Sequence, residues 1–256
     1  MNFSVQTFVG WQWAPLQFRR RLALAPTIEP ISSVAIDVAG SYAGSYHVLE
    51  LGQHFDAYTD PHTPRAFYSV PQLPNWVPAD PLLERNRAAD ITGNIGEIIA
   101  GLLAKRLFGV PPHHIVHLRA RKKLTPDYLL HDVPQLQAYV AQISQIPAAR
   151  LPEHWPVESK AGIDSLGRYE SEKALRQLIA YWIDISRRYP KGVGYGVIVT
   201  TELTAARITV SIIMPLGKRR AKRLRTYLRA RRSYERFCQL GQDLTLITAC
   251  LRGFNG

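Results

Sequence analysis

From Leu82 to the end of the chain, the sequence alternates between patterns typical of helices and patterns typical of strands. A helical pattern with an apolar stripe is followed by short strand-like runs. A long helical pattern and two β-branched runs, at residues 194–202 and 207–214, come next. A strongly basic helical pattern follows them. Such mixing predicts an α/β fold in which helices flank a central mixed sheet.

The first 85 residues have strand-like and proline-rich patterns instead of this alternation of helices and strands. Runs at residues 32–38 and 46–51 have strand character, and the Gly-, Ser- and Tyr-rich segment between them is typical of a hairpin turn. Six prolines between Pro61 and Pro81 then predict an extended segment. We therefore expect a β-rich and proline-rich N-terminal appendage over residues 1–85 and a main domain over residues 86–256.

Three residues in the main domain suggest a metal-dependent phosphodiesterase site. Residues 154–162 alternate as a strand does, which places Glu158 and Lys160 on one face. Asp127 opens a second strand-like run directly after a proline, which a strand tolerates at its first position. Two carboxylates on neighbouring strands can hold Mg²⁺ together with waters and a substrate phosphate. Lys160 would then stabilise the charge of the transition state or help to activate water, and both roles stay open.

A fourth candidate comes from the helical pattern at residues 89–106. Its apolar stripe runs along Ile95, Ile98, Ile99, Leu102 and Leu103, and Glu97 lies on the opposite side. The neighbours of Glu97 on that side are small residues without charge: Gly93, Ala100, Gly101 and Ala104. A solvated helix face normally carries more charge, so we expect close packing there. Glu97 is a candidate third metal ligand, directly or through water.

These residues, in the order Glu97, Pro126-Asp127 and Glu158-Ser-Lys160, resemble the PD-(D/E)xK nuclease superfamily. The resemblance covers residues 90–190. It implies the restriction-endonuclease-like fold and a Mg²⁺- or Mn²⁺-dependent deoxyribonuclease, with Asp127, Glu158 and Glu97 as metal ligands and Lys160 as the catalytic cation.

Two further features place the resemblance within the superfamily. Gln177 and Tyr181 reproduce the Gln-x-x-x-Tyr element of the RecB-like and Cas4-like branch, which implies that they position nucleic acid near the metals. Cys238 and Cys250 are the only cysteines, so the four-cysteine iron–sulfur cluster of Cas4-type nucleases cannot form. The sequence also departs from a simple hairpin, because a helix-like insert at residues 134–146 separates Asp127 from Glu158. Their two strands therefore need not be direct neighbours.

The charge of the chain points to a polyanionic partner. It carries 32 Lys and Arg against 20 Asp and Glu, a formal net charge of +12. Ten basic residues and one acid lie between Lys218 and Arg236 in a helix-prone run whose buried edge is Leu224, Tyr227 and Leu228. Smaller basic groups lie at residues 19–21 and 119–123. We expect phosphate contacts, principally to DNA with RNA left open, from Lys218, Arg219, Arg220, Lys222, Arg223 and Arg225.

No pattern in the sequence predicts a signal peptide or a membrane span, and the two cysteines give no disulfide framework. We expect a cytoplasmic protein without a membrane partner. The leading hypothesis is therefore a nuclease that hydrolyses phosphodiester bonds in DNA. Two alternatives stay open: a non-catalytic nucleic-acid-binding or packaging protein, and a sequence-specific restriction-type endonuclease. Taken singly, each of the four site residues also fits an ordinary structural role.

Overall fold

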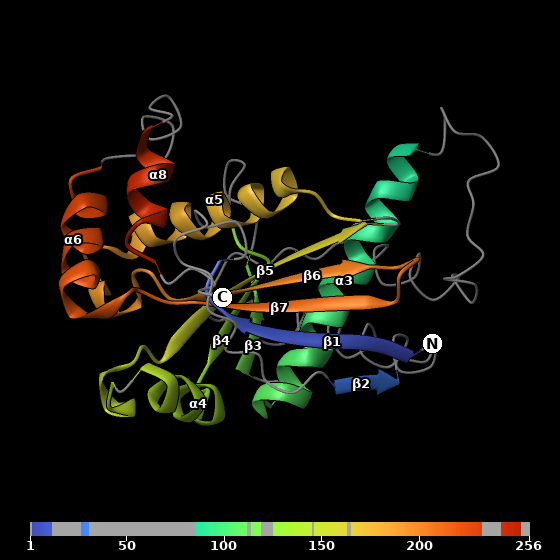
Figure 1. Ribbon diagram of the computed structural model, residues 1–256, viewed down its shortest axis with the longest axis horizontal. Coiled ribbons are helices and arrows are strands. Elements are labelled where there is room, and N and C mark those ends of the chain that lie inside the picture. The colour runs from blue at the N-terminus through green and yellow to red at the C-terminus, as the bar shows by residue number, and fades with distance from the viewer. Residues whose placement is uncertain are drawn as a thin grey trace.

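The computed structural model describes residues 2–11, 27–30, 85–111, 114–118, 125–144, 146–162, 165–231 and 242–251. Within these residues, seven strands form one mixed sheet in the spatial order β2-β1-β7-β6-β5-β4-β3, with helices packed against it (Figure 1). The predicted α/β class and the mixed sheet flanked by helices are thereby confirmed.

The strand β5 (His154–Gly162) organises the sheet around the candidate site. It pairs antiparallel with β4 (Tyr128–His131) along one edge and parallel with β6 (Gly196–Glu202) along the other. The remaining strands extend the sheet on both sides: β3 (Ile115–His117) next to β4, and β7 (Arg207–Ile213), β1 (Asn2–Val9) and β2 (Thr27–Pro30) beyond β6.

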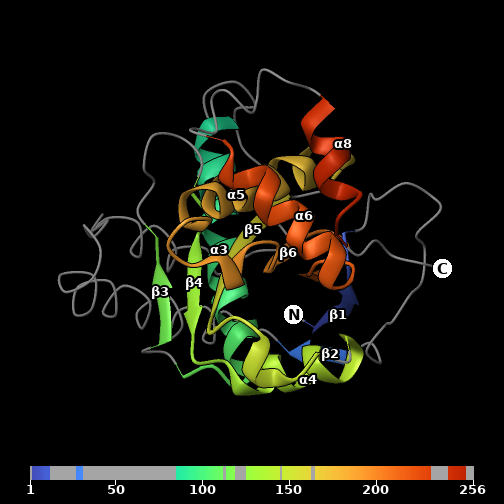
Figure 2. The same ribbon diagram turned by 90° about the vertical axis from the view of Figure 1, so that its left-hand side faces the viewer.

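Helices cover both faces of this sheet (Figures 1 and 2). The helices α3 (Arg85–Phe108) and α4 (Pro134–Ser144) share one apolar cluster with the sheet. On the opposite face, a second cluster joins α5 (Arg168–Ile185), α6 (Gly217–Arg229) and α8 (Gln242–Thr248). Because β5 and β6 are parallel, α5 forms the crossover between them.

Alternation along β5 explains how one strand serves both layers. Trp155 and Val157 are buried in the cluster that includes α3. Residues at the intervening positions face α5, whose apolar stripe of Leu175, Leu178 and Trp182 is fully buried. The Trp182 indole N–H donates to the Tyr195 carbonyl at 2.9 Å, so the buried ring has a satisfied polar group. Both faces of the strand are thus fixed by packing.

The predicted elements of the main domain lie within a few residues of those in the structure. The strand adjacency that the insert left open is present. Despite the intervening α4, β4 and β5 are direct neighbours, with Tyr128 opposite Val157 and Leu130 opposite Trp155. The helix α4 packs Leu136 and Val140 into the apolar cluster that includes α3, so the insert does not separate β4 from β5.

The start of the chain belongs to the same sheet. β1 runs parallel to β7, and its alternate residues Phe3, Val5, Thr7 and Val9 are buried. The strand-like runs and the proline-rich segment expected between residues 31 and 84 lie outside the described residues, so the division at residue 85 stays a prediction.

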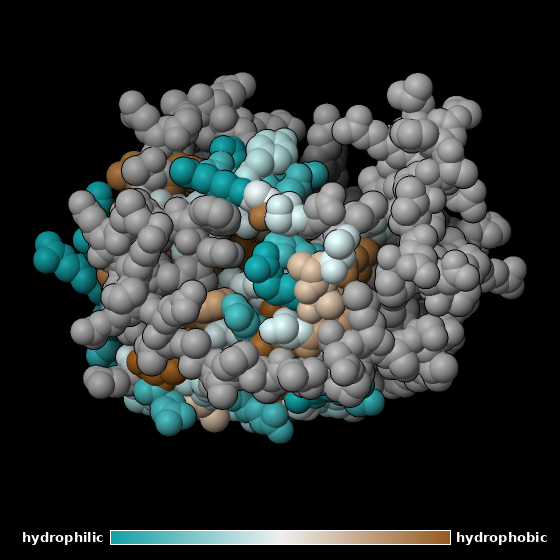
Figure 3. All heavy atoms as spheres, turned by 45° about the vertical axis from the view of Figure 1, so that its right-hand side comes forward, coloured by the Kyte–Doolittle hydropathy of each residue, from teal (hydrophilic) through white to brown (hydrophobic). Residues whose placement is uncertain are grey.

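None of the described helices is long and apolar enough to cross a membrane. On the face drawn in Figure 3, the described residues present hydrophilic side chains grouped near the centre beside a smaller apolar group. Among the described residues, the large hydrophobic side chains that are exposed are Tyr169 and Leu246.

Candidate active site

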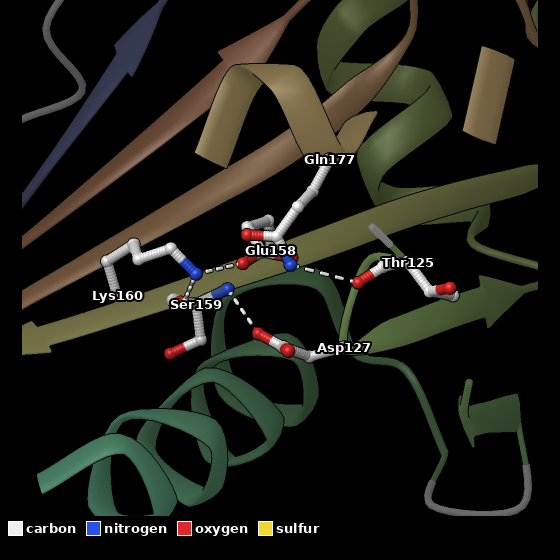
Figure 4. A network of polar contacts seen from close by, with 6 residues as sticks. All are labelled: Thr125, Asp127, Glu158, Ser159, Lys160 and Gln177. Carbon is white, nitrogen blue, oxygen red and sulfur yellow. Dashed lines mark hydrogen bonds and ion pairs between the residues drawn. The ribbon is translucent and has the colours of Figure 1, made fainter. Parts of the chain in front are cut away.

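Glu158 and Lys160 lie on the α5 side of β5, as the period-two pattern predicts. The Glu158 side chain is completely buried, and Lys160 Nζ donates to Glu158 Oε1 and, at 3.0 Å, to the Ser159 carbonyl (Figure 4). The second carboxylate oxygen of Glu158, Oε2, is buried without a hydrogen-bond partner among the described residues. An ionised group with one unsatisfied oxygen is costly to bury, so this position calls for a further cation or donor.

Asp127 reaches the same place from the neighbouring strand. It lies in a bend immediately before β4, where its carbonyl accepts the Leu118 N–H at 2.8 Å. Its carboxylate Oδ2 accepts the Ser159 N–H at 2.7 Å (Figure 4). Val157 is the last residue of β5 that pairs with β4, and two residues later the Asp127 side chain takes the place of a ladder acceptor. The end of the β4–β5 pairing therefore brings Asp127 beside Glu158.

Glu97 approaches from α3, which crosses β5 at very short range. A Cβ built on Gly96 would lie 2.7 Å from Ala161 Cβ and 2.9 Å from Ser159 Oγ, so only glycine fits there without a shift. The small neighbours Ala100 and Ala104 are also buried. Close packing is therefore confirmed at Ala100 and Ala104 and wrong at Gly93 and Gly101, where the described residues leave open space, while Gly96 makes the closest contact.

The charges of these groups interact. Burial raises the pKa of Glu158 well above its ordinary value, and the carboxylates of Asp127 and Glu97 raise it further, while Lys160 opposes both. Burial works to lower the pKa of Lys160, but Glu158, Asp127 and, more weakly, Glu170 outweigh it, and the net shift is upward. Asp127, Lys160 and Glu97 are therefore each within electrostatic reach of Glu158. Carboxylates outnumber cations among them.

A divalent cation fits this donor set chemically. The carboxylates supply hard oxygen ligands, and Glu158 Oε2 is an acceptor in need of a partner. Among the described residues, however, no three His, Cys, Asp or Glu side chains already stand at the separations of a metal shell. Glu158 Oε1 is taken by Lys160, and Asp127 Oδ2 is taken by the Ser159 N–H. Binding of a cation would therefore require these side chains to move from their present contacts.

Gln177 and Tyr181 come from the middle of α5. The Gln177 amide Nε2 donates to the Thr125 carbonyl at 3.0 Å, while its Oε1 is buried without a partner among the described residues. Tyr181 is half-buried against the α5 cluster, and burial, with the nearby Tyr189, raises the pKa of its hydroxyl. Gln177 thus joins the site through the strand loop, and most of the Tyr181 ring lies within the protein.

The predicted basic helix is present as α6, with Leu224 and Leu228 buried as expected. Its cations Lys218, Arg219, Lys222 and Arg223 are exposed, while Arg220 and Arg225 are half-buried. The Arg231 guanidinium lies 4.4 Å from the centre of the Tyr227 ring. The rest of the predicted basic run, from residue 232 on, and the two smaller basic groups, at residues 19–21 and 119–123, lie outside the described residues.

The basic helix lies away from the predicted site residues. Glu170, in the first turn of α5, is close enough to Lys160 to raise its pKa. The helix α6 lies beside the opposite end of α5 (Figure 1). With 18 residues, α5 is about 27 Å long. A nucleic acid that touched both α6 and the predicted site residues would therefore have to extend along part of α5.

Sequence reasoning missed three residues that the structure brings to the site. Ser159 contributes its backbone N–H, Thr125 contributes its carbonyl, and Glu170 contributes charge. Backbone groups leave no signal in residue type, so the first two could not have been found. Nothing in the sequence distinguishes Glu170 from an ordinary acidic residue in the first turn of a helix.

Comparison of the chain with protein-family models, with curated proteins and with solved structures found no match. Assignment of function therefore rests on the residues and their geometry.

Proposed function

We propose that this chain is a divalent-metal-dependent nuclease that hydrolyses phosphodiester bonds in DNA, with a restriction-endonuclease-like fold of the PD-(D/E)xK type. The observation that carries the proposal is the convergence of Asp127, Glu158 and Lys160 at the point where β4 and β5 stop pairing. A completely buried glutamate, one oxygen of which has no hydrogen-bond partner in the described part of the chain, supports a binding role over a purely structural one.

Asp127 and Glu158 would hold Mg²⁺ or Mn²⁺, with Glu97 as an accessory ligand. The ion, when bound, neutralises charge on the phosphate oxygens and lowers the pKa of a coordinated water. Lys160, whose raised pKa keeps it protonated at neutral pH, would place a positive charge beside the reacting phosphate. The exposed cations of α6 would hold the nucleic acid through phosphate contacts.

The test is cleavage of linear and circular DNA by the parent and by Lys160→Ala, in Mg²⁺ and in EDTA. Loss of the charge next to the reacting phosphate should lower the rate by several orders of magnitude, as removal of a preorganised electrostatic group typically does. Lys173→Ala is the matched control, because Lys173 is an exposed lysine of α5. It should cleave at the parental rate.

Two results would contradict the proposal. Equal cleavage by Lys160→Ala and by the parent would mean that the activity belongs elsewhere. DNA binding without any metal-dependent cleavage would favour a non-catalytic nucleic-acid-binding protein, which the one-signed charge of α6 would also support. Comparison of linear with circular substrates separates exonuclease from endonuclease action.

A further inference from the structure

The Gln177 side chain links the crossover helix to the loop that carries Asp127. The Gln177 amide donates to the carbonyl of Thr125, two residues before Asp127, although the two residues lie 52 positions apart in the chain (Figure 4). Gln177 stands in the middle of α5, which is anchored by buried side chains on both sides of it: Leu175 and Leu178. The contact therefore ties the loop to a rigid element.

The Thr125 loop leads directly into Asp127, so an anchor at Thr125 bears on where Asp127 lies. Residues 125–127 belong to no strand, and Pro126 has no N–H with which to join a ladder. Past the loop, Asp127 is held through its carbonyl by Leu118 and through its carboxylate by Ser159. Removal of the Gln177 donor would take away one anchor of this turn, the hydrogen bond to the Thr125 carbonyl.

The amide oxygen of Gln177, Oε1, is a second feature that points to a role in the site. This oxygen is buried and has no partner among the described residues, as is the case for Glu158 Oε2. Figure 4 shows Gln177 extending from α5 toward both Glu158 and the Thr125 loop. Buried carbonyl oxygens are normally hydrogen-bonded, so this one is suited to accept a hydrogen bond from water in the site.

We propose that Gln177 is a positioning residue of the metal site: it fixes the Asp127 carboxylate relative to Glu158 through the Thr125 carbonyl, instead of contacting nucleic acid. This inference rests on the proposed function. The Gln-x-x-x-Tyr resemblance implies that Gln177 positions nucleic acid. The positioning role predicts instead that loss of the Gln177 amide lowers the affinity for metal and does not change the affinity for DNA.

The variant Gln177→Met keeps the length of the side chain and removes the donor. We expect its affinity for Mn²⁺, measured by electron paramagnetic resonance titration without DNA, to fall about 10- to 100-fold, as for other residues that orient metal ligands. In the metal-free protein, the Ser159 amide should exchange with solvent faster by nuclear magnetic resonance, because its Asp127 acceptor is less fixed. Affinity for DNA in EDTA should not change.

Two further variants make the comparison specific. Gln142→Met makes the same chemical change at an exposed position of α4 and should leave all three quantities at parental values. Gln177→Asn keeps the amide but shortens the side chain by one methylene, so it should behave as Gln177→Met does. It also serves as the test if Gln177→Met does not fold.

The outcomes separate this inference from the proposed function. If the parent binds Mn²⁺ and the Gln177 variants bind it equally well, the positioning role is wrong and the nuclease proposal stands. If the variants lose DNA affinity in EDTA and keep Mn²⁺ affinity, Gln177 contacts nucleic acid and the inference is again wrong. If the parent itself binds no Mn²⁺, the proposed function fails and the inference fails with it.

Discussion

The close crossing of α3 and β5 predicts that replacement of glycine by alanine stabilises the protein at some positions of α3 and destabilises it at another. Gly93, Gly96 and Gly101 all lie within α3, and in an open helical position replacement of glycine by alanine stabilises a protein by roughly 0.5–1 kcal/mol. Gly93 and Gly101 have nothing within 4 Å of an added Cβ. Gly93→Ala and Gly101→Ala should therefore raise the free energy of unfolding by about that amount.

At Gly96 the same substitution meets an obstacle. The new Cβ would stand 2.7 Å from Ala161 Cβ and 3.4 Å from the Ala161 backbone nitrogen, neither of which belongs to a flexible side chain. Relief of such overpacking by movement of a helix or strand typically costs about 1–3 kcal/mol. With the helical gain subtracted, Gly96→Ala should lower the free energy of unfolding by about 1 kcal/mol. It should also slow cleavage, because α3 would carry Glu97 away from Glu158.

The assay is urea unfolding of the three variants, followed by circular dichroism, together with the double variant Gly96→Ala/Ala161→Gly. Removal of the Ala161 methyl group removes the nearest contact, so the two changes should be coupled and should partly compensate each other. The reasoning would be refuted if Gly96→Ala were as stable as Gly93→Ala, or if the double variant showed no coupling.

Two other predictions concern charge. Replacement of the exposed cations Lys218, Arg219 and Lys222 by glutamine should reduce the salt dependence of DNA affinity by about one slope unit per lost phosphate contact. An unchanged salt slope in a folded variant would mean that α6 contacts something other than nucleic acid. For pH, the raised pKa of Glu158 means that the metal-free folded protein binds more protons than the unfolded chain above the ordinary glutamate pKa. Its stability should fall as pH rises from that value toward the raised pKa, and Mn²⁺ affinity should rise over the same range because the ion displaces the proton. In Glu158→Gln both dependences should be weaker, as measured by unfolding and by Mn²⁺ titration at several pH values.

Local patterns in the sequence predicted most of the elements around the site. The helical stripe containing Ile98, Ile99 and Leu103 is buried as expected, and the period of two in β5 correctly placed Glu158 and Lys160 on one face. These predictions succeeded because burial of one helix side or one strand face is set by neighbouring residues in the chain. The spacing of side chains is then fixed by backbone geometry.

What the sequence did not predict depends on partners far along the chain. The alternation of Phe3, Val5, Thr7 and Val9 is visible in the sequence, but nothing local indicates that β1 pairs with β7 near the other end. The pairing of β4 with β5 was likewise hidden, because α4 separates them in sequence. Which glycine of α3 meets the sheet depends on the angle at which the helix crosses it. The small residues of its sequence indicated close packing without identifying Gly96.

The hydrogen bond from the Ser159 N–H to Asp127 has a consequence for how the sheet avoids self-association. Where β4 leaves β5, the Ser159 N–H has no ladder partner in β4, and unpaired donors at a strand edge are the groups to which extended chains add. The Asp127 carboxylate occupies the Ser159 donor and places a negative charge at this edge. Under the proposed function, one acid would therefore serve both chemistry and protection of the edge. Loss of the whole side chain would remove both at once, whereas asparagine, which retains an acceptor oxygen at the same distance from the backbone, would remove the charge and keep the edge closed.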